Sequence, residues 1–215
     1  MKYYYLFLLC FFVQFTSATA LPQYGFWCSG QVTLENDVVL EGDISYDLKF
    51  DALQIKKDGV IRTYTAQNIA AFEIFDPIKY RHRKYVAIDY AMGEGYDRKT
   101  FFEVLSDGEL MVLRKSKYIR RPRVTEDFRA PHIYLNVVCR HTYYVYREGE
   151  FMEVEDFQSQ VLPLMRSHHR QIKDYVQRCD LKLREIHEQM RVVNLYNQLV
   201  AIGETDKLLT ESVGK

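Results

Sequence analysis

The sequence predicts an α+β protein in which an antiparallel β-hairpin sheet or partly closed barrel is followed by two or three C-terminal helices. Two observations predict this class. Runs of aromatic and β-branched residues are joined in pairs by short turns that contain Asp or Gly, which is the pattern of β-hairpins. After Asp156, the chain changes to Gln, Lys, Arg, Glu, Leu and Met, with apolar residues at helical spacing.

The N-terminus has the pattern of a secretory signal peptide over residues 1–20. Lys2 precedes an apolar run from Tyr3 to Phe15, and the small residues Ala18 and Ala20 suit signal peptidase. Because the apolar run is short for a membrane span, no transmembrane segment is expected after cleavage near Ala20. The mature chain is therefore expected to be secreted or periplasmic.

The mature chain is long enough for one substantial domain and is nearly neutral. Residues 21–155 are expected to form a β-rich body and 156–203 a helical unit packed on it, while 204–215 form a flexible tail. Removal of Lys2 with the signal leaves 28 of the 29 Lys and Arg residues against 29 Asp and Glu residues. This balance does not imply a global polyanion partner, and nucleic acid is not expected.

Four hairpins organise the predicted body. The first begins near Gly30 and turns at 35–37, and Gly42 marks a bulge or a point of close backbone approach. In the later turns, Asp-Gly supplies the positive φ that a tight turn needs. The other three hairpins are expected at 53–65, 101–115 and 143–155.

Three further strands are expected between these hairpins. They are Ile69–Phe75, Val86–Tyr90 and His132–Val138. Pro77 is expected to end the first of them, because proline lacks the amide proton that a ladder needs. A basic loop is expected to follow, from Lys79 to Tyr85.

The C-terminal part is predicted to form two or three helices. Pro163 marks the end or a kink of the first, Asp180 is the predicted N-cap of the last, and Gly203 is expected to end it. One apolar stripe follows the last helix, at Leu183, Ile186, Met190, Val193, Asn197 and Val200. The stripe is expected to dock on the sheet or on neighbouring helices, and binding of a partner protein is the alternative.

The candidate ligand site is a basic segment, 114–123, in which six of ten residues are Lys or Arg. These residues are Arg114, Lys115, Lys117, Arg120, Arg121 and Arg123. Their charge, with Tyr118 as a stacking face, would suit an anionic glycan. A solvated strand edge explains them as well, and the acidic run from Glu148 to Asp156 could neutralise them within the fold.

Neither the cysteines nor the histidines define a catalytic or metal site. Cys28, Cys139 and Cys179 allow at most one internal disulfide, or they are three buried thiols. Cys139 and His141 lie on one face of a predicted strand and, with a carboxylate, could serve a metal-dependent hydrolase. No CxxC, HxxxH or G-x-S-x-G pattern accompanies them, so no catalytic residue, metal ligand or cofactor is assigned.

The order of these features resembles that in one group of exported proteins. A Gly30–Tyr46 opening of the form G-x-V-x-L…L-x-G-x-I-x-Y precedes the hairpins at 101–115 and 143–155 and a helical LYNQLV segment. This combination resembles a loose group of uncharacterised secreted proteins from Bacteroidetes. The resemblance implies export and the β-then-α layout, and it carries no activity, ligand or catalytic residue.

We therefore expect an exported, non-enzymatic binding module of the cell envelope or the secreted fraction. An envelope protein and an anionic glycan are the expected kinds of partner. Two alternatives stay open at this stage. One is a periplasmic hydrolase, metal-dependent or other, and the second is an assembly factor that binds a partner through its C-terminal helices.

Overall fold

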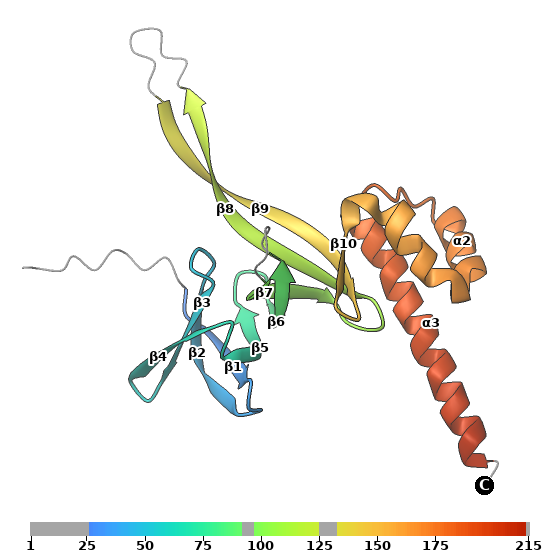
Figure 1. Cartoon of the computed structure of the whole chain (residues 1–215), viewed down its shortest axis with the longest axis horizontal. Coiled ribbons are helices and arrows are strands. Elements are labelled where there is room, and N and C mark those ends of the chain that lie inside the picture. Colours follow the sequence, from blue (N-terminus) through green and yellow to red (C-terminus); the bar gives the residue numbers. More distant parts are fainter. Residues whose placement is uncertain (1–25, 92–96, 125–132, 214–215) are drawn as a thin grey trace, which may run out of the picture.

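Ten strands form one open antiparallel sheet in the computed structural model, and helices follow them (Figure 1). The structure describes residues 26–91, 97–124 and 133–213, and side chains within 26–91, 97–120, 137–203 and at 205. The strands are β1 (Cys28–Leu34), β2 (Val39–Asp47), β3 (Ala52–Lys57), β4 (Val60–Thr65), β5 (Ile69–Asp76), β6 (Arg81–Ala91), β7 (Asp97–Ser106), β8 (Met111–Val124), β9 (Ile133–Arg147) and β10 (Glu150–Glu153). The predicted α+β class is confirmed.

The strand order is β10-β9-β8-β7-β6-β5-β1-β2-β3-β4, so β1 lies between β2 and β5. The four predicted hairpins are confirmed as β1–β2, β3–β4, β7–β8 and β9–β10. The β3–β4 turn shows why the sequence predicts them. Asp58 and Gly59 both have positive φ, 50° and 77°, as a type I′ turn requires.

Two expectations about the strands are wrong. The basic loop does not extend to Tyr85, because β6 begins at Arg81 and pairs with β5 from Asp76 onwards. The strand expected at 132–138 and the first strand of the last hairpin are one continuous strand, β9. Basic and polar residues obscured both strands, since they occupy positions where a half-buried strand usually has apolar side chains.

The sheet curls at a pair of glycines. Gly30 of β1 pairs with Gly42 of β2 in an unbroken register, so Gly42 is a point of close approach and not a bulge. A Cβ atom on Gly30 would lie 2.1 Å from the Glu73 carbonyl oxygen, and one on Gly42 would lie 2.6 Å from that of Lys56. The backbones can therefore approach this closely only without side chains.

An aromatic core fills the inside of this curl. The ring of Tyr46 on β2 lies 5.3 Å from that of Phe72 on β5 and 5.6 Å from that of Phe101 on β7. In a flat sheet, β2 and β7 would be separated by three intervening strands, at about 4.8 Å per strand. The ring contacts therefore require β2 and β3 to fold over β5–β7.

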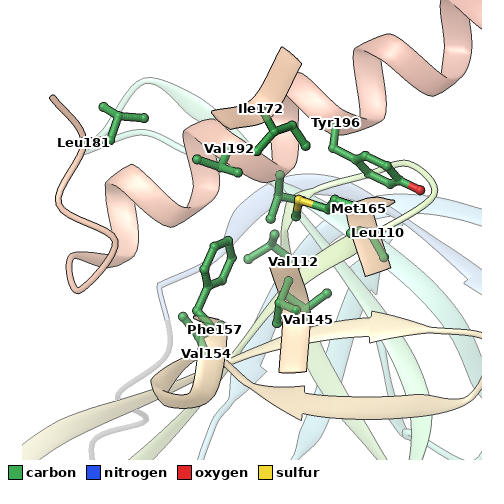
Figure 2. Packing of buried hydrophobic residues seen from close by; sticks show 12 residues of the cluster. Leu110, Val112, Val145, Val154, Phe157, Met165, Ile172, Leu181, Val192 and Tyr196 are labelled. Carbon is green, nitrogen blue, oxygen red and sulfur yellow. The ribbon is translucent and has the colours of Figure 1, made fainter. Parts of the chain in front are cut away.

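A second core lies between the other end of the sheet and the helical unit. The helices are η1 (Val154–Asp156, 3-10), η2 (Phe157–Val161, π), η3 (Leu162–His168, 3-10), α2 (His169–Arg178) and α3 (Ile186–Val213). Figure 2 shows Leu110 of the β7–β8 turn, with Val112 and Val145 of the sheet, packed beneath Met165 and Tyr196 of the helices. The apolar stripe of α3 contributes to this core, so it is used within the fold.

Two expected helix boundaries are wrong. Asp180 is no N-cap, since it has a positive φ of 47° in the turn after α2, and α3 begins at Ile186. Gly203 does not end α3, which continues to Val213. Residues 204–213 include two Glu, two Leu and one Lys, whose helix propensity helps to offset the glycine. Among the described residues, no helix is both long and apolar enough to cross a membrane.

Candidate functional site

The basic segment belongs to a long two-stranded ribbon. β8 and β9 pair continuously from Met111–Tyr146 to Val124–Ile133. β7 pairs with β8 only as far as Glu103–Arg114, and beyond that rung β8 and β9 leave the sheet together (Figure 1). We call this projecting part, 115–124 with 133–142, the arm.

Charge is concentrated on these two strands. β8 and β9 together contain eight Lys and Arg residues and no Asp or Glu. The whole chain, in contrast, has 29 basic and 29 acidic residues. Overall neutrality therefore conceals a basic ribbon on an otherwise acidic molecule, which a count over the whole chain does not reveal.

Arg114 anchors the base of the arm to the face of the sheet that carries both cores, here called the inner face. Its Nε donates to Glu103 Oε2 at 3.1 Å, and Arg83 Nη2 donates to the same oxygen at 2.8 Å. Arg81 Nη2 lies 3.6 Å from Glu103 Oε1. The Glu103 side chain is only 4% exposed, so it is a buried carboxylate shared by arginines of β6 and β8. Burial raises the pKa of Glu103, but hydrogen bonds from Arg83 and Arg114 outweigh it and leave the pKa below its usual value.

Lys115 anchors the arm on the opposite face, here called the outer face. Its Nζ donates to the Phe101 carbonyl oxygen at 3.1 Å, lies 3.3 Å from Asp51 Oδ2 and contacts Thr100 Oγ1. Asp51 Oδ2 also accepts from the Phe101 amide at 3.3 Å, and Asp51 Oδ1 accepts from the Tyr46 hydroxyl at 2.7 Å. The side chains of Asp51 and Lys115 thus form hydrogen bonds with the Phe101 amide and carbonyl groups at the point where β8 no longer pairs with β7. We call the pair Asp51 and Lys115 the clip.

Replacing Asp51 by asparagine is expected to lower the free energy of unfolding by about 2 kcal/mol, because Lys115 would lose the counter-charge of a half-buried ammonium group. Urea denaturation measures the change. Asp58→Asn is the matched control, since Asn-Gly suits the same type I′ turn and Asp58 is exposed. Equal stability of the two variants would show that the clip does not hold the arm.

Three cations of the arm do not anchor it to the body. Lys117, Arg120 and Arg140 are exposed, and none has an ion-pair partner among the side chains that the structure describes. Lys117 lies directly opposite Arg140 on the outer face. Like charges directly opposite one another destabilise a ladder, so an anion between them would relieve the repulsion.

The six basic residues predicted as a patch do not share one face. Alternation along β8 places Arg114 and Arg120 on the inner face and Lys115 and Lys117 on the outer face. The side chains of Arg121 and Arg123 lie outside the described residues. Arg140 was missed because it is an isolated cation in the sequence of β9, and only the register brings it opposite Lys117.

The acidic run at 148–156 does not neutralise the basic segment within the described side chains. Glu148 lies 3.8 Å from Arg147, which is outside the basic segment, and the described ion pairs of the segment itself are with carboxylates outside the acidic run. Glu103 and Asp51 take that role for Arg114 and Lys115. The curl of the sheet, which brings Asp51 to β7 and β8, decides this pairing.

The groups of the alternative metal site lie on the inner face of the arm. Cys139 is exposed, and His141 Nδ1 lies 2.8 Å from Ser116 Oγ on the paired strand. Burial and the charge of Arg114 lower the pKa of His141. In the part of the chain that the structure describes, no three His, Cys, Asp or Glu residues come together as metal ligands. Cys28, Cys139 and Cys179 are all free thiols.

Comparison of this protein with family models, with curated proteins and with solved structures finds no match. The resemblance to secreted Bacteroidetes proteins therefore stays a prediction. Export stays a prediction as well, because residues 1–25 lie outside the described part. The function has to be argued from the arm.

Proposed function

We propose that the chain is an exported, non-enzymatic binding module that holds an anionic polysaccharide along its arm. One observation carries the proposal. Lys117, Arg120 and Arg140 are exposed cations on strands that contain no acid, while the adjacent Arg114 and Lys115 are neutralised by carboxylates of the body. The cations that have no anchoring role are thus the ones available to a ligand.

The shape of the arm suits a polymer more than a small ligand. Both faces of a projecting ribbon are accessible, and residues on one face recur about every 7 Å along a strand. Tyr118, which is 54% exposed and lies on the inner face with Arg120, offers an aromatic face for a sugar ring beside that charge. The anchors at Arg114 and Lys115 fix the direction of the arm, which reduces the entropy lost on binding.

Equilibrium binding of fluorescently labelled polysaccharides to residues 21–215 tests the proposal. Heparin and polygalacturonate, which are anionic, are expected to bind, and neutral dextran is not. The triple variant Lys117→Gln, Arg120→Gln and Arg140→Gln is expected to lower heparin affinity at least about tenfold, since it removes the unpaired cations.

The β3–β4 hairpin offers a matched control. Lys56, Lys57 and Arg62 are exposed there, and their replacement by glutamine removes the same charge. This control is expected to change heparin affinity by less than about twofold. Equal losses in both triple variants would contradict a role for the arm. Equally tight, arm-dependent binding of single-stranded DNA would replace the polysaccharide by a nucleic acid.

A further inference from the structure

We infer that a small cavity at the base of the arm holds one neutral sugar residue of the polysaccharide. This inference rests on the proposed function and adds a part of the ligand that the cations of the arm do not recognise. The cavity has a volume of about 130 Å³ and lies between β9, η1 and the residues around the start of α3. The residues of its lining that carry the inference are His141, Tyr143, Glu153, Glu155, Arg184 and Gln189.

The cavity lies beside the inner face of the arm, where β10 ends. β10 pairs with β9 only as far as Glu153, and beyond that rung β9 has no described strand on this side. His141 lies on the inner face of β9, and the same face of the arm carries Tyr118 and Arg120. Arg120 pairs with Val137, four residues from His141, which corresponds to about 14 Å along the strand. A polymer that contacts Arg120 and Tyr118 therefore needs only a few sugar residues to reach the cavity.

The charged groups at the rim of the cavity do not pair with one another. Glu153, Glu155 and Arg184 are exposed, and none of them forms an ion pair among the side chains that the structure describes. The two carboxylates can accept hydrogen bonds and the guanidinium group can donate them. Because a hydroxyl group both donates and accepts, the hydroxyls of a sugar can bond to all three side chains.

Gln189 is a second, independent indication that the cavity takes a ligand. Its side chain lines the cavity, and the residue is only 4% exposed. Its Nε2 donates to the Val154 carbonyl oxygen at 3.2 Å and to the Leu183 carbonyl oxygen at 2.8 Å, which fixes the amide group. Its Oε1 is buried and accepts no hydrogen bond from the residues that the structure describes. A buried acceptor without a donor costs free energy, and a ligand hydroxyl would supply the donor.

The size and charge of the cavity favour a neutral sugar ring. An apolar cavity of about 150 Å³ can hold one benzene ring, so this volume suits a single six-membered ring. The lining carries two carboxylates and one guanidinium group, and His141 is neutral at neutral pH because burial and the charge of Arg114 lower its pKa. The net negative charge disfavours an acidic sugar, and an ammonium group cannot accept a hydrogen bond from Arg184. Tyr143 and Ile186 offer apolar surface to the C–H groups of the ring.

Binding of methyl glycosides to residues 21–215, measured by saturation-transfer NMR, tests the inference. The probes are the methyl glycosides of glucose, galactose, mannose and N-acetylglucosamine. At least one is expected to bind with millimolar affinity, which is too weak for dextran to be retained under the conditions of the heparin assay. The double variant Glu153→Gln and Glu155→Gln is expected to lower this affinity at least about fivefold, because a carboxylate is a stronger acceptor than an amide.

The β9–β10 hairpin offers a matched control in the double variant Glu148→Gln and Glu150→Gln. It removes the same charge from a neighbouring position outside the cavity. All four glutamates are exposed, so neither variant disturbs the core. The control is expected to change the affinity for the methyl glycoside by less than about twofold.

The outcomes separate this inference from the proposed function. If heparin binds through the arm but no neutral glycoside binds, or if both double variants lose equal affinity, the cavity is not a sugar site while binding by the arm stands. If methyl glucosaminide, which carries an ammonium group, or methyl glucuronide, which carries a carboxylate, binds more tightly than every neutral glycoside, the assignment to a neutral residue is overturned. If a neutral glycoside binds but heparin and polygalacturonate do not, the proposed function fails and the cavity is not part of a polysaccharide site.

Discussion

Replacing Glu103 by glutamine is expected to lower the free energy of unfolding by about 3 kcal/mol, because it leaves partly buried guanidinium groups without a counter-charge. Glu103 is 4% exposed, and Arg114 is 14% exposed. Glutamine has nearly the same size, so the loss reports charge and not packing. Because Arg83 keeps more contact with solvent, the expected loss is at the lower end of the range for buried pairs.

The pH dependence of stability gives this prediction a second readout. The pKa of Glu103 is lowered in the folded protein, so its contribution to stability is complete above the unfolded-state pKa of about 4.3. That contribution is lost as pH falls from there through the lower folded-state pKa. Between these values, the stability of the unmodified protein is expected to fall more steeply with decreasing pH than that of Glu103→Gln.

Glu109→Gln is the matched control for Glu103→Gln. Glu109 lies 2.7 Å from Arg147 but is 35% exposed, so its replacement is expected to cost less than about 1 kcal/mol. Urea denaturation at neutral and acidic pH measures both variants. Equal losses for the two, or the same acid dependence in Glu103→Gln and the unmodified protein, would show that Glu103 is not the buried counter-charge of the arm.

Replacing Gly30 by alanine is expected to cost more than about 3 kcal/mol or to prevent folding, because the new methyl group has no space. Its Cβ would lie 2.1 Å from the Glu73 carbonyl oxygen and 2.8 Å from Ile44 Cδ1. The nearer atom belongs to the backbone of β5, so no side-chain rotation relieves the clash. The two strands would have to separate at the corner, which would also disturb the aromatic core around Phe72.

Gly203→Ala in α3 is the control for Gly30→Ala. Nothing lies within 4 Å of a Cβ at Gly203, so alanine is expected to stabilise the helix by about 0.5 to 1 kcal/mol. Circular dichroism and urea denaturation measure both variants. A Gly30→Ala protein with unchanged stability would contradict the close packing of β1 against β5.

Local sequence patterns predicted well the four hairpins and the order of the two parts, a sheet followed by helices. Asp58-Gly59 shows why, since a type I′ turn depends on the conformation of two adjacent residues. For Gly42 the sequence left a bulge and a close approach as alternatives, because an isolated glycine in a strand marks either, and the structure shows the close approach. The end of α3 was predicted wrongly, because the helix propensity of the residues after Gly203 outweighed the effect of a single glycine.

The candidate site was predicted only in part, because its chemistry depends on contacts distant in sequence. The sequence indicated six basic residues, and alternation alone places Arg114 and Lys115 on opposite faces. It did not indicate that Asp51, 64 residues away from Lys115, would reach the arm. That contact follows from the curl of the sheet, and the pairing of Lys117 with Arg140 follows from the strand register.

The salt dependence of heparin binding tests the central claim most directly. Log affinity falls as log salt concentration rises, and each cation that contacts a densely charged polyanion makes this slope steeper by about one unit because counterions are released. The slope of the unmodified protein is expected to be steeper than that of the Lys117→Gln, Arg120→Gln and Arg140→Gln variant by about three units. Equal slopes would show that these cations do not contact the polymer and would contradict the assignment of the arm as the binding surface.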